Sequence, residues 1–124
     1  IVIKHNLQSE VQFLGDRNDI PNILQAFDVF IFPSIYEGLG ISILEAQASG
    51  LPCITSTGVP DDADISTNIA HLDLTEEIEK WCEVIGDMDI NKRSSNVDLD
   101  PKYDIVKNAD ILTEFYLEYI KIHK

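Results

Sequence analysis

The most informative segment of this chain reads Ser34-Ile35-Tyr36-Glu37-Gly38-Leu39-Gly40-Ile41-Ser42-Ile43-Leu44-Glu45-Ala46. Two glutamates, Glu37 and Glu45, flank a turn that contains Gly38 and Gly40. Because glycine has no Cβ, both glycines allow positive φ angles and close backbone approach. The stretch therefore places two carboxylates beside a tight turn that leads into a helix.

The residues on either side of this turn predict a strand, a helix and a second strand. Residues 29–32 are continuously apolar, which is typical of a parallel strand buried on both faces. A helix is expected over about residues 40–49, closed by Gly50, and residues 53–55 form the next strand. In such a parallel crossover, ligands bind beyond the carboxyl ends of the strands. The turn lies there, where the amides of a helix N-terminus attract phosphate.

Helical periodicity predicts how the glutamate on this helix is placed. Ile41, Leu44 and Ala48 form the expected core-facing stripe, and Glu45 falls at its edge. Burying an unpaired charge costs several kcal/mol, and each hydrogen bond to a charged group returns about 1.5–3 kcal/mol. The hydroxyls of a ribose diol would suit such a carboxylate. The alternative is that Glu45 is half exposed or pairs with a lysine, as is common for a helical glutamate.

Four segments together resemble the C-terminal half of a retaining glycosyltransferase of the GT-B fold, family 4, similar to bacterial capsular and exopolysaccharide transferases. The segments are residues 11–15 (VQFLG), 26–34 (AFDVFIFPS), 37–45 (the E-x7-E signature) and 45–52 (EAQASGLP). The resemblance implies an α/β fold, with a Rossmann-like parallel sheet flanked by helices. It also implies that residues 1–124 are a partial C-terminal nucleotide-sugar-binding domain, truncated at its N-terminal side.

The resemblance assigns roles to the residues of the turn and the helix. Glu37 would be the catalytic carboxylate, which contacts hydroxyls of the donor sugar. Glu45 would hold the ribose hydroxyls. The backbone amides of four residues would bind the donor sugar and its diphosphate, namely Gly38, Leu39, Gly40 and Ile41.

A second segment would border the nucleobase. By the same resemblance this is the neighbourhood of Gly15, Arg17 and Asn18. Arg17 could equally be a solvated cation that pairs with Asp16 or Asp19, an interaction worth about 0–1 kcal/mol.

The implied activity is transfer of a sugar, with retention, from a nucleoside diphosphate sugar to a saccharide or lipid-linked acceptor in cell-surface polysaccharide synthesis. The donor is a substrate, and no cofactor or metal is expected. The acceptor and the basic residues for the diphosphate would belong to parts outside this chain, so we expect the fragment alone to be inactive. Alternatives are a noncatalytic Rossmann-like interaction or sensor module, or a GT-B sugar-nucleotide epimerase.

Residues 57–64 depart from the family pattern, because one glycine and three aspartates stand where many relatives have Gly-Gly followed by glutamate. We interpret them as an acidic surface turn with no ligand. His71 and His123 lack an acid or base partner in sequence, and we expect structural or solvated roles for both. Lys4 and His5 receive no role, and residues 1–7 suit either a helix or a strand.

Composition limits the partners of this chain. Its 124 residues fit one domain, and its net charge of −13 argues against direct contact with nucleic acid or an anionic membrane. The sequence has no apolar run near 18 residues and no signal-peptide pattern. Cys53 on a strand and Cys82 on a helix have no metal-like spacing and suggest a reducing compartment. We expect a cytoplasmic protein, with the inner face of the membrane as a further option for the intact enzyme.

Three more helices complete the expected organisation. Residues 20–26 form a short helix with Asp19 as cap, and residues 75–85 form a helix capped by Thr75 with a core-facing stripe of Ile78, Trp81, Cys82 and Ile85. Residues 87–100 are a polar loop with solvated charges. A final helix over about residues 101–122 has an apolar face that we expect to be exposed in this chain.

Overall fold

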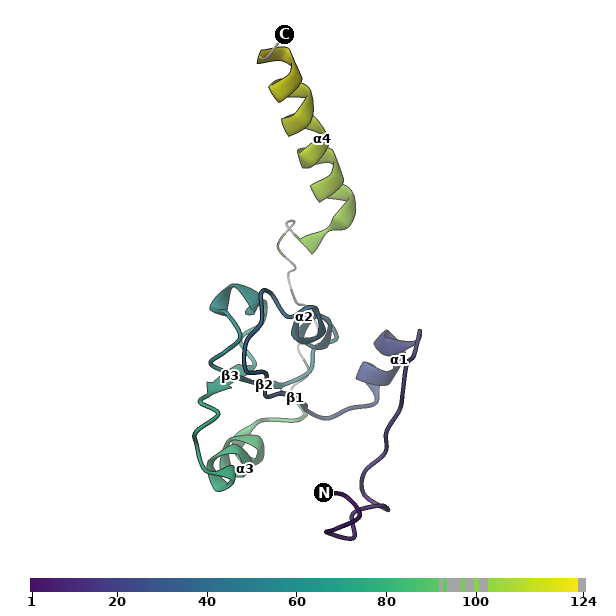
Figure 1. Ribbon diagram of the computed structural model, residues 1–124, viewed down its shortest axis with the longest axis vertical. Helices are drawn as coiled ribbons and strands as arrows, with labels where there is room; N and C mark the ends of the chain where they lie inside the picture. The colour runs from purple at the N-terminus through teal and green to yellow at the C-terminus, as the bar shows by residue number, and fades with distance from the viewer. Residues whose placement is uncertain (92, 94–96, 98–99, 101–102, 123–124) are drawn as a thin grey trace.

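The computed structural model of the chain describes residues 1–91, 93, 97, 100 and 103–122. Three parallel strands form one sheet in the order β1 (Phe30–Phe32), β2 (Cys53–Ser56) and β3 (Ile69–Leu72) (Figure 1). Since all three strands run in the same direction, their carboxyl ends share one edge of the sheet. The expected α/β class with a parallel sheet is confirmed.

Helices flank this sheet on both sides (Figure 1). The helix α2 (Ile41–Ala48) covers one face and α3 (Ile78–Asp87) the other, with α1 (Ile20–Gln25) beside α2. A short 3-10 helix, η1 (Asp61–Ala63), follows β2. The predicted helices over residues 20–26 and 40–49 are therefore confirmed to within a residue or two.

The last helix, α4 (Ile105–Ile122), projects away from the sheet (Figure 1) and has no buried residue. Its apolar side chains are exposed, as expected, including Ile111, Leu112 and Phe115. Asp104 caps its first turn, because its Oδ1 accepts hydrogen bonds from the backbone N–H groups of Val106 and Lys107. The first two positions of the predicted helix, 101 and 102, lie outside the described residues. No helix in the described part of the chain combines the length and apolarity that crossing a membrane requires.

The core lies between the sheet and α2, and it corrects the predicted face of that helix. Ile43 and Ala46 are fully buried there, whereas Ile41 is 70% exposed and Ala48 is also exposed. The pattern failed because apolar residues occupy nearly every side of this helix, so periodicity alone selects no face. Gly40 sets the start of the helix, and packing on the sheet then turns positions 43, 46 and 47 inward.

The expectation that β1 is buried on both faces is wrong. Phe30 and Phe32 pack against the core below α2, but Ile31, on the opposite face, is 46% exposed. Ile31 instead lines a cavity of about 320 Å³ together with Trp81 and Ile85 of α3. Because β1 is at the edge of the sheet, α3 covers this face only in part.

The helix α3 begins three residues later than predicted, and Thr75 does not cap it. Asp73 Oδ1 accepts hydrogen bonds from the Thr75 backbone N–H at 2.8 Å and from its hydroxyl at 2.7 Å, which closes a turn before the helix. The backbone hydrogen bond first, and then the hydroxyl one, lower the pKa of Asp73. Of the predicted stripe Trp81 is buried, whereas Ile78 and Cys82 are exposed.

Two further expectations need correction. The Arg93 guanidinium is not solvated: it donates hydrogen bonds to the carbonyls of Gln25 (2.9 Å) and Phe27, at the C-terminus of α1. Carbonyls at a helix end have no intrahelical donor, and Arg93 supplies one. Residues 1–7 form turns, neither helix nor strand, as shown by the hydrogen bond from the His5 amide to the Ile1 carbonyl at 3.0 Å.

Candidate functional site

The glycine turn, residues 33–40, lies at the carboxyl edge of the sheet, where the crossover geometry predicts a ligand. It follows β1 directly and ends where α2 begins. On its other side it contacts the segment that follows β2, since the Glu37 backbone N–H donates to the Gly58 carbonyl at 3.1 Å. Two strand ends and one helix N-terminus therefore meet at this turn.

The two glycines of the turn behave differently. Gly40 has φ +74° and stands before the first residue of α2, as predicted. A Cβ there would lie 3.1 Å from Ile43 Cγ2 and 3.5 Å from Phe32 Cε1. Gly38 does not use this freedom, since its φ is not positive and its added Cβ would meet nothing within 4 Å. The left-handed residue Gly40 is enough to turn the chain into the helix. Gly38 is not needed for that turn and is exposed to solvent.

The backbone at this helix start offers hydrogen-bond donors. The Gly40 carbonyl accepts from the amides of Ile43 and Leu44, which closes the first turn of α2. The amides of Ile41 and Ser42 precede that turn, where N–H groups have no intrahelical acceptor. Together with the positive end of the helix dipole, such groups favour an anion.

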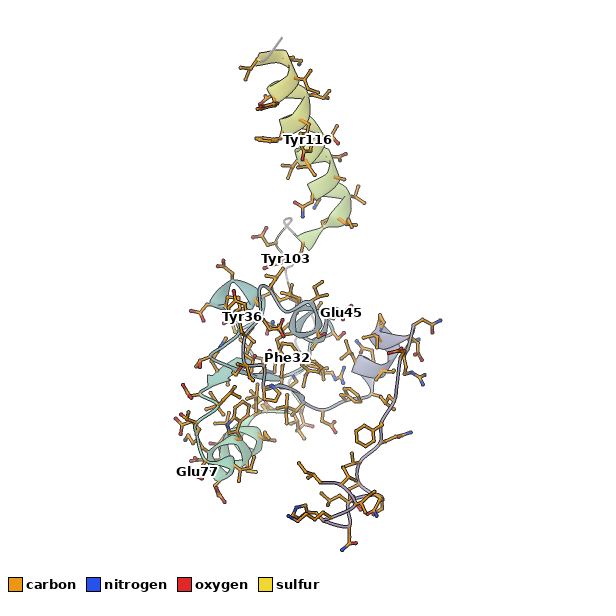
Figure 2. All side chains as sticks on the ribbon, viewed as in Figure 1. Phe32, Tyr36, Glu45, Glu77, Tyr103 and Tyr116 are labelled. Atoms are coloured by element: carbon orange, nitrogen blue, oxygen red, sulfur yellow. The ribbon has the colours of Figure 1, made fainter. Side chains whose placement is uncertain are left out.

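Glu37 is held in place within the turn. Its side chain is half-buried, and its Oε1 accepts a hydrogen bond from Ser34 Oγ at 2.8 Å. Ile35 and Tyr36 precede it and are more than 80% exposed, and Figure 2 shows Tyr36 beside the end of the sheet. The carboxylate is thus fixed at the strand end, among residues that face outward.

Glu45 is exposed on the side of α2 that faces α1 (Figure 2). In the described part of the chain no hydrogen bond reaches its carboxylate. The prediction that Glu45 falls at the edge of the core-facing stripe is wrong, because the buried face of α2 lies on the opposite side, at positions 43, 46 and 47. Of the two alternatives, exposure is confirmed and a lysine partner does not appear among the described residues. Together with Ser42, Gly15 and Arg17 it lines a cavity of about 270 Å³. The remaining lining residues are apolar: Leu14, Ile20, Ile23, Leu24, Phe27 and Phe30.

The structure therefore brings together two groups of predicted site residues that are some 30 positions apart in the sequence. Gly15, with φ +66°, and Arg17 face the same cavity as Glu45. Asn18 lines a neighbouring, more open hollow of about 560 Å³, which it shares with Arg17 and Asp19.

The Arg17 guanidinium makes a two-point contact with Asp19. Its Nε and Nη2 donate to the two carboxylate oxygens at 2.8 and 2.7 Å. This hydrogen bonding, and then the opposite charge, raises the pKa of Arg17, and the same hydrogen bonding lowers the pKa of Asp19. The predicted pairing with Asp19 is confirmed, and Asp19 consequently makes no side-chain cap on α1.

Sequence reasoning missed two residues that support the site. Gln47 is fully buried, and its amide donates to the Ala63 carbonyl at 2.8 Å and accepts from the backbone N–H groups of Ile65 (3.0 Å) and Ser66 (3.1 Å). It ties α2 to the loop after η1. Gly58, treated as part of a surface turn, contacts the backbone of the glycine turn. A lone glutamine among apolar helix positions was the available signal for the first.

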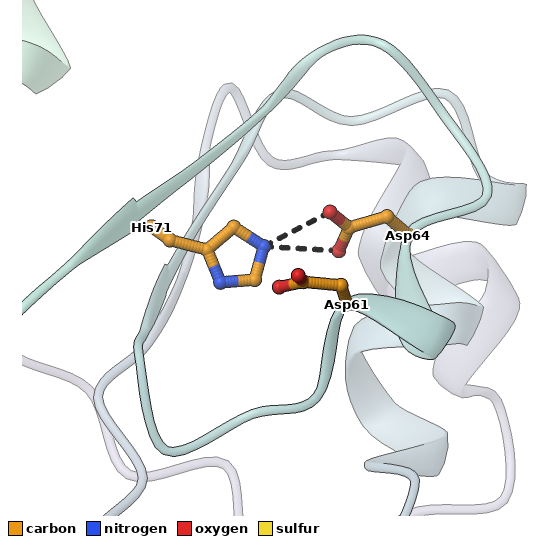
Figure 3. A group of neighbouring side chains, drawn as sticks. All are labelled: Asp61, Asp64 and His71. Carbon is orange, nitrogen blue, oxygen red and sulfur yellow. Dashed lines mark hydrogen bonds and ion pairs between the residues drawn. The ribbon is translucent and has the colours of Figure 1, made fainter.

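The acidic turn after β2 forms a cluster with one histidine (Figure 3). His71 Nε2 lies 3.0 Å from both carboxylate oxygens of Asp64, and Asp61 lies beside them, with one ligand atom from each residue within 4.8 Å of the others. The carboxylates are exposed, as expected for an acidic surface turn. The hydrogen bond with Asp64 gives His71 a structural partner that the sequence spacing did not reveal.

Comparison with known proteins places the sequence of this chain in a family. Residues 2–87, which include both glutamates and the whole sheet, match the family model described as "Glycosyl transferases group 1". EpsF of Bacillus subtilis (strain 168), a protein assigned as a glycosyltransferase, is 45% identical over 84 residues, which are 67% of this chain and 22% of that protein.

A second relative is similar over almost the full chain. It is the UDP-Gal:alpha-D-GlcNAc-diphosphoundecaprenol alpha-1,3-galactosyltransferase of Escherichia coli, 36% identical over 122 residues, which are 93% of this chain and 32% of the enzyme. The O-antigen chain mannosyltransferase B of Escherichia coli is 31% identical over 60% of this chain and 23% of its own length. The chain thus spans less than a third of each of these relatives. It belongs to the group 1 glycosyltransferase family.

Proposed function

We propose that this chain forms the donor-binding part of a retaining glycosyltransferase, which transfers a sugar from a nucleoside diphosphate sugar to a saccharide or lipid-linked acceptor. One observation carries the proposal: Glu45, Gly15 and Arg17 line one cavity beside the glycine turn that holds Glu37. The names of relatives that transfer galactose and mannose in surface-polysaccharide synthesis support the class of reaction.

Glu45 is proposed to bind the ribose of the donor. Its carboxylate lines the cavity without a hydrogen-bond donor among the described residues, so it can accept hydrogen bonds from both hydroxyls of a diol. Hydrogen bonds to a charged acceptor contribute about 1.5–3 kcal/mol each. The apolar lining from α1 and β1, including Ile23 and Phe30, suits the face of a nucleobase, with Gly15 and Arg17 at its edge and Asn18 in the adjoining hollow.

The start of α2 is proposed to bind the diphosphate. Backbone amides of Gly38, Leu39, Gly40 and Ile41 would stabilise the negative charge that develops on the leaving group, as the donors of an oxyanion hole do. A helix N-terminus contributes only about 0.3–1 kcal/mol per charge at a surface. Because the chain has a net charge of −13, we propose that cationic groups outside it complete the site. No metal or other cofactor enters this proposal.

Glu37 is the proposed catalytic carboxylate. Ser34 fixes one of its oxygens, so the other is available to a hydroxyl of the transferred sugar. Its role is to orient and polarise that sugar while the bond to the diphosphate breaks and the acceptor attacks the same face.

Titration of the intact protein with UDP, GDP, UDP-galactose and GDP-mannose, followed through backbone amide NMR signals, tests the proposal. We expect shifts at residues 38–45 and 14–17 for one of the two bases. The variant Glu45→Ala should lose them, and Glu114→Ala, on the exposed surface of α4, should retain them. Equal shifts in both variants, or none with any ligand up to millimolar concentration, would contradict the proposal.

A further inference from the structure

Gly58 lies so close to the backbone of the glycine turn that it leaves no space for a side chain. A Cβ on Gly58 would lie 2.3 Å from the Ile35 carbonyl oxygen, 2.7 Å from its carbon and 2.9 Å from the Ser34 carbonyl oxygen. All three are backbone atoms, which cannot rotate away as a side chain can. Because φ of Gly58 is not in the left-handed region, glycine is required here for space alone.

Hydrogen bonds join the same two segments. The Gly58 carbonyl accepts from the Glu37 N–H at 3.1 Å, and the fully buried hydroxyl of Ser56 donates to the Ser34 carbonyl. One residue earlier, Thr55 Oγ1 donates to the Phe32 carbonyl at 3.1 Å. The end of β2 therefore supports the backbone on which Glu37 stands.

The Glu37 side chain is held by Ser34, which lies on the same turn. Ser34 Oγ donates to its Oε1 at 2.8 Å, and the Ser34 backbone is the part that Gly58 and Ser56 contact. The backbone and the carboxylate of Glu37 are thus fixed by neighbours from two strand ends before any ligand arrives. Gly40, which shapes the helix start, packs instead on Phe32 and Ile43.

We infer that Gly58 and Ser34 are positioning residues that form a brace for Glu37 and so determine how strongly the site prefers a nucleoside diphosphate sugar over the bare diphosphate. The inference rests on the proposed function and adds these two residues to it. Since the brace acts on Glu37 and not on the cavity that Glu45 lines, its loss should affect recognition of the sugar and spare that of the nucleotide.

Calorimetric titrations of the intact protein with UDP and UDP-galactose, and with GDP and GDP-mannose, measure this preference. Ser34→Ala removes the charge-assisted hydrogen bond to Glu37, and Gly58→Ala displaces the backbone that carries Glu37. Each variant should reduce the preference for the sugar derivative by about tenfold or more. Affinity for the bare diphosphate should stay within about twofold, the change expected when the nucleotide contacts are intact. Ser34→Thr, which keeps a hydroxyl, should restore the preference.

Gly86→Ala is the matched control, because Gly86 has no positive φ and its added Cβ meets nothing within 4 Å. It should leave both affinities unchanged. Equal losses for the diphosphate and its sugar derivative in Gly58→Ala and Ser34→Ala would overturn the brace and leave the proposed function standing. Unchanged sugar preference in both variants would overturn it as well.

Hydrogen exchange of the Glu37 amide tests the brace without a ligand. In the wild type this amide should exchange at least about tenfold more slowly than in Gly58→Ala, since a backbone hydrogen bond between packed segments protects it. If the wild type binds none of the four ligands, the proposed function fails, and this exchange rate still decides whether the brace exists. Equal exchange rates would overturn it.

Discussion

The two walls of the cavity that holds Glu45 are supported very differently. On one wall, α2 is anchored by the fully buried side chains of Ile43, Ala46 and Gln47. On the other wall, residues 11–18 are exposed throughout, and Arg17 pairs with its near neighbour Asp19. The proposed ribose and diphosphate contacts therefore come from a preformed element, whereas the proposed nucleobase side is shaped by local interactions. A ligand would find one half of its site already ordered.

Removing the apolar anchor of α2 should have the largest effect. Ile43→Ala leaves a cavity in the core and should lower the free energy of unfolding by about 2–5 kcal/mol. Ile41→Ala, at a position that is 70% exposed, should change it by less than about 0.5 kcal/mol. Urea denaturation followed by circular dichroism measures both. A larger loss for Ile41→Ala would mean that α2 packs through the face that periodicity predicts, and equal losses would contradict the exposed position of Ile41.

Replacing Gln47, the buried polar anchor of α2, should lower the free energy of unfolding nearly as much. Gln47→Met preserves length but leaves the N–H groups of Ile65 and Ser66 without their acceptor, at a cost of about 1–3 kcal/mol. Gln12→Met, at an exposed position, serves as the control in the same denaturation experiment. If both variants are as stable as the wild type, α2 is not tied to the loop after η1.

The two glycines of the glycine turn, Gly38 and Gly40, should differ in how much their replacement by alanine destabilises the fold. Gly40→Ala must place a Cβ at φ +74° and 3.1 Å from Ile43 Cγ2, so it should cost at least about 1–2 kcal/mol. Gly38→Ala meets no neighbour and should leave stability within about 0.5 kcal/mol of the wild type. Thermal unfolding of the two variants checks this. A larger loss for Gly38→Ala would contradict the geometry of the turn.

The smallest effect is expected on the exposed wall. Because the pKa of Asp19 is lowered in the folded chain, its contribution is present above the pKa of the unfolded carboxyl and is lost as pH falls through the folded value. The contribution is small, since both partners are exposed to solvent. Side-chain carboxyl NMR titration should find Asp19 titrating at a lower pH than in Arg17→Gln. Coincident titrations in the two proteins would show that the ion pair does not persist in solution.

Local order along the chain was predictable where it depends on neighbouring residues. The apolar run before Pro33, the left-handed glycine at position 40 and Gly50 after α2 act within a few residues, so the order of strand, turn, helix and strand follows from them. The positions of Glu37 and Glu45 relative to the turn follow as well. The faces of β1 and α2 were not predictable, because both carry apolar side chains on more than one side.

Tertiary contacts decided the remainder. Arg93 caps α1 from a segment 66 or more residues away in the chain, and nothing in its polar neighbourhood distinguishes it from a solvated cation. The sequence likewise indicates only a turn residue at Gly58, whereas in the structure its carbonyl accepts a hydrogen bond from the Glu37 backbone N–H.

The α/β class, the family resemblance and the spacing of the two carboxylates could be read from the sequence, because they depend on composition, local backbone preferences and linear order. Only the tertiary structure decided that Gly15 and Arg17 face Glu45, that Gln47 is a buried anchor and that Gly58 stands against the Glu37 turn. The physical reason is that packing joins segments through shape and unsatisfied backbone groups, and neither quantity is encoded at a fixed separation along the chain.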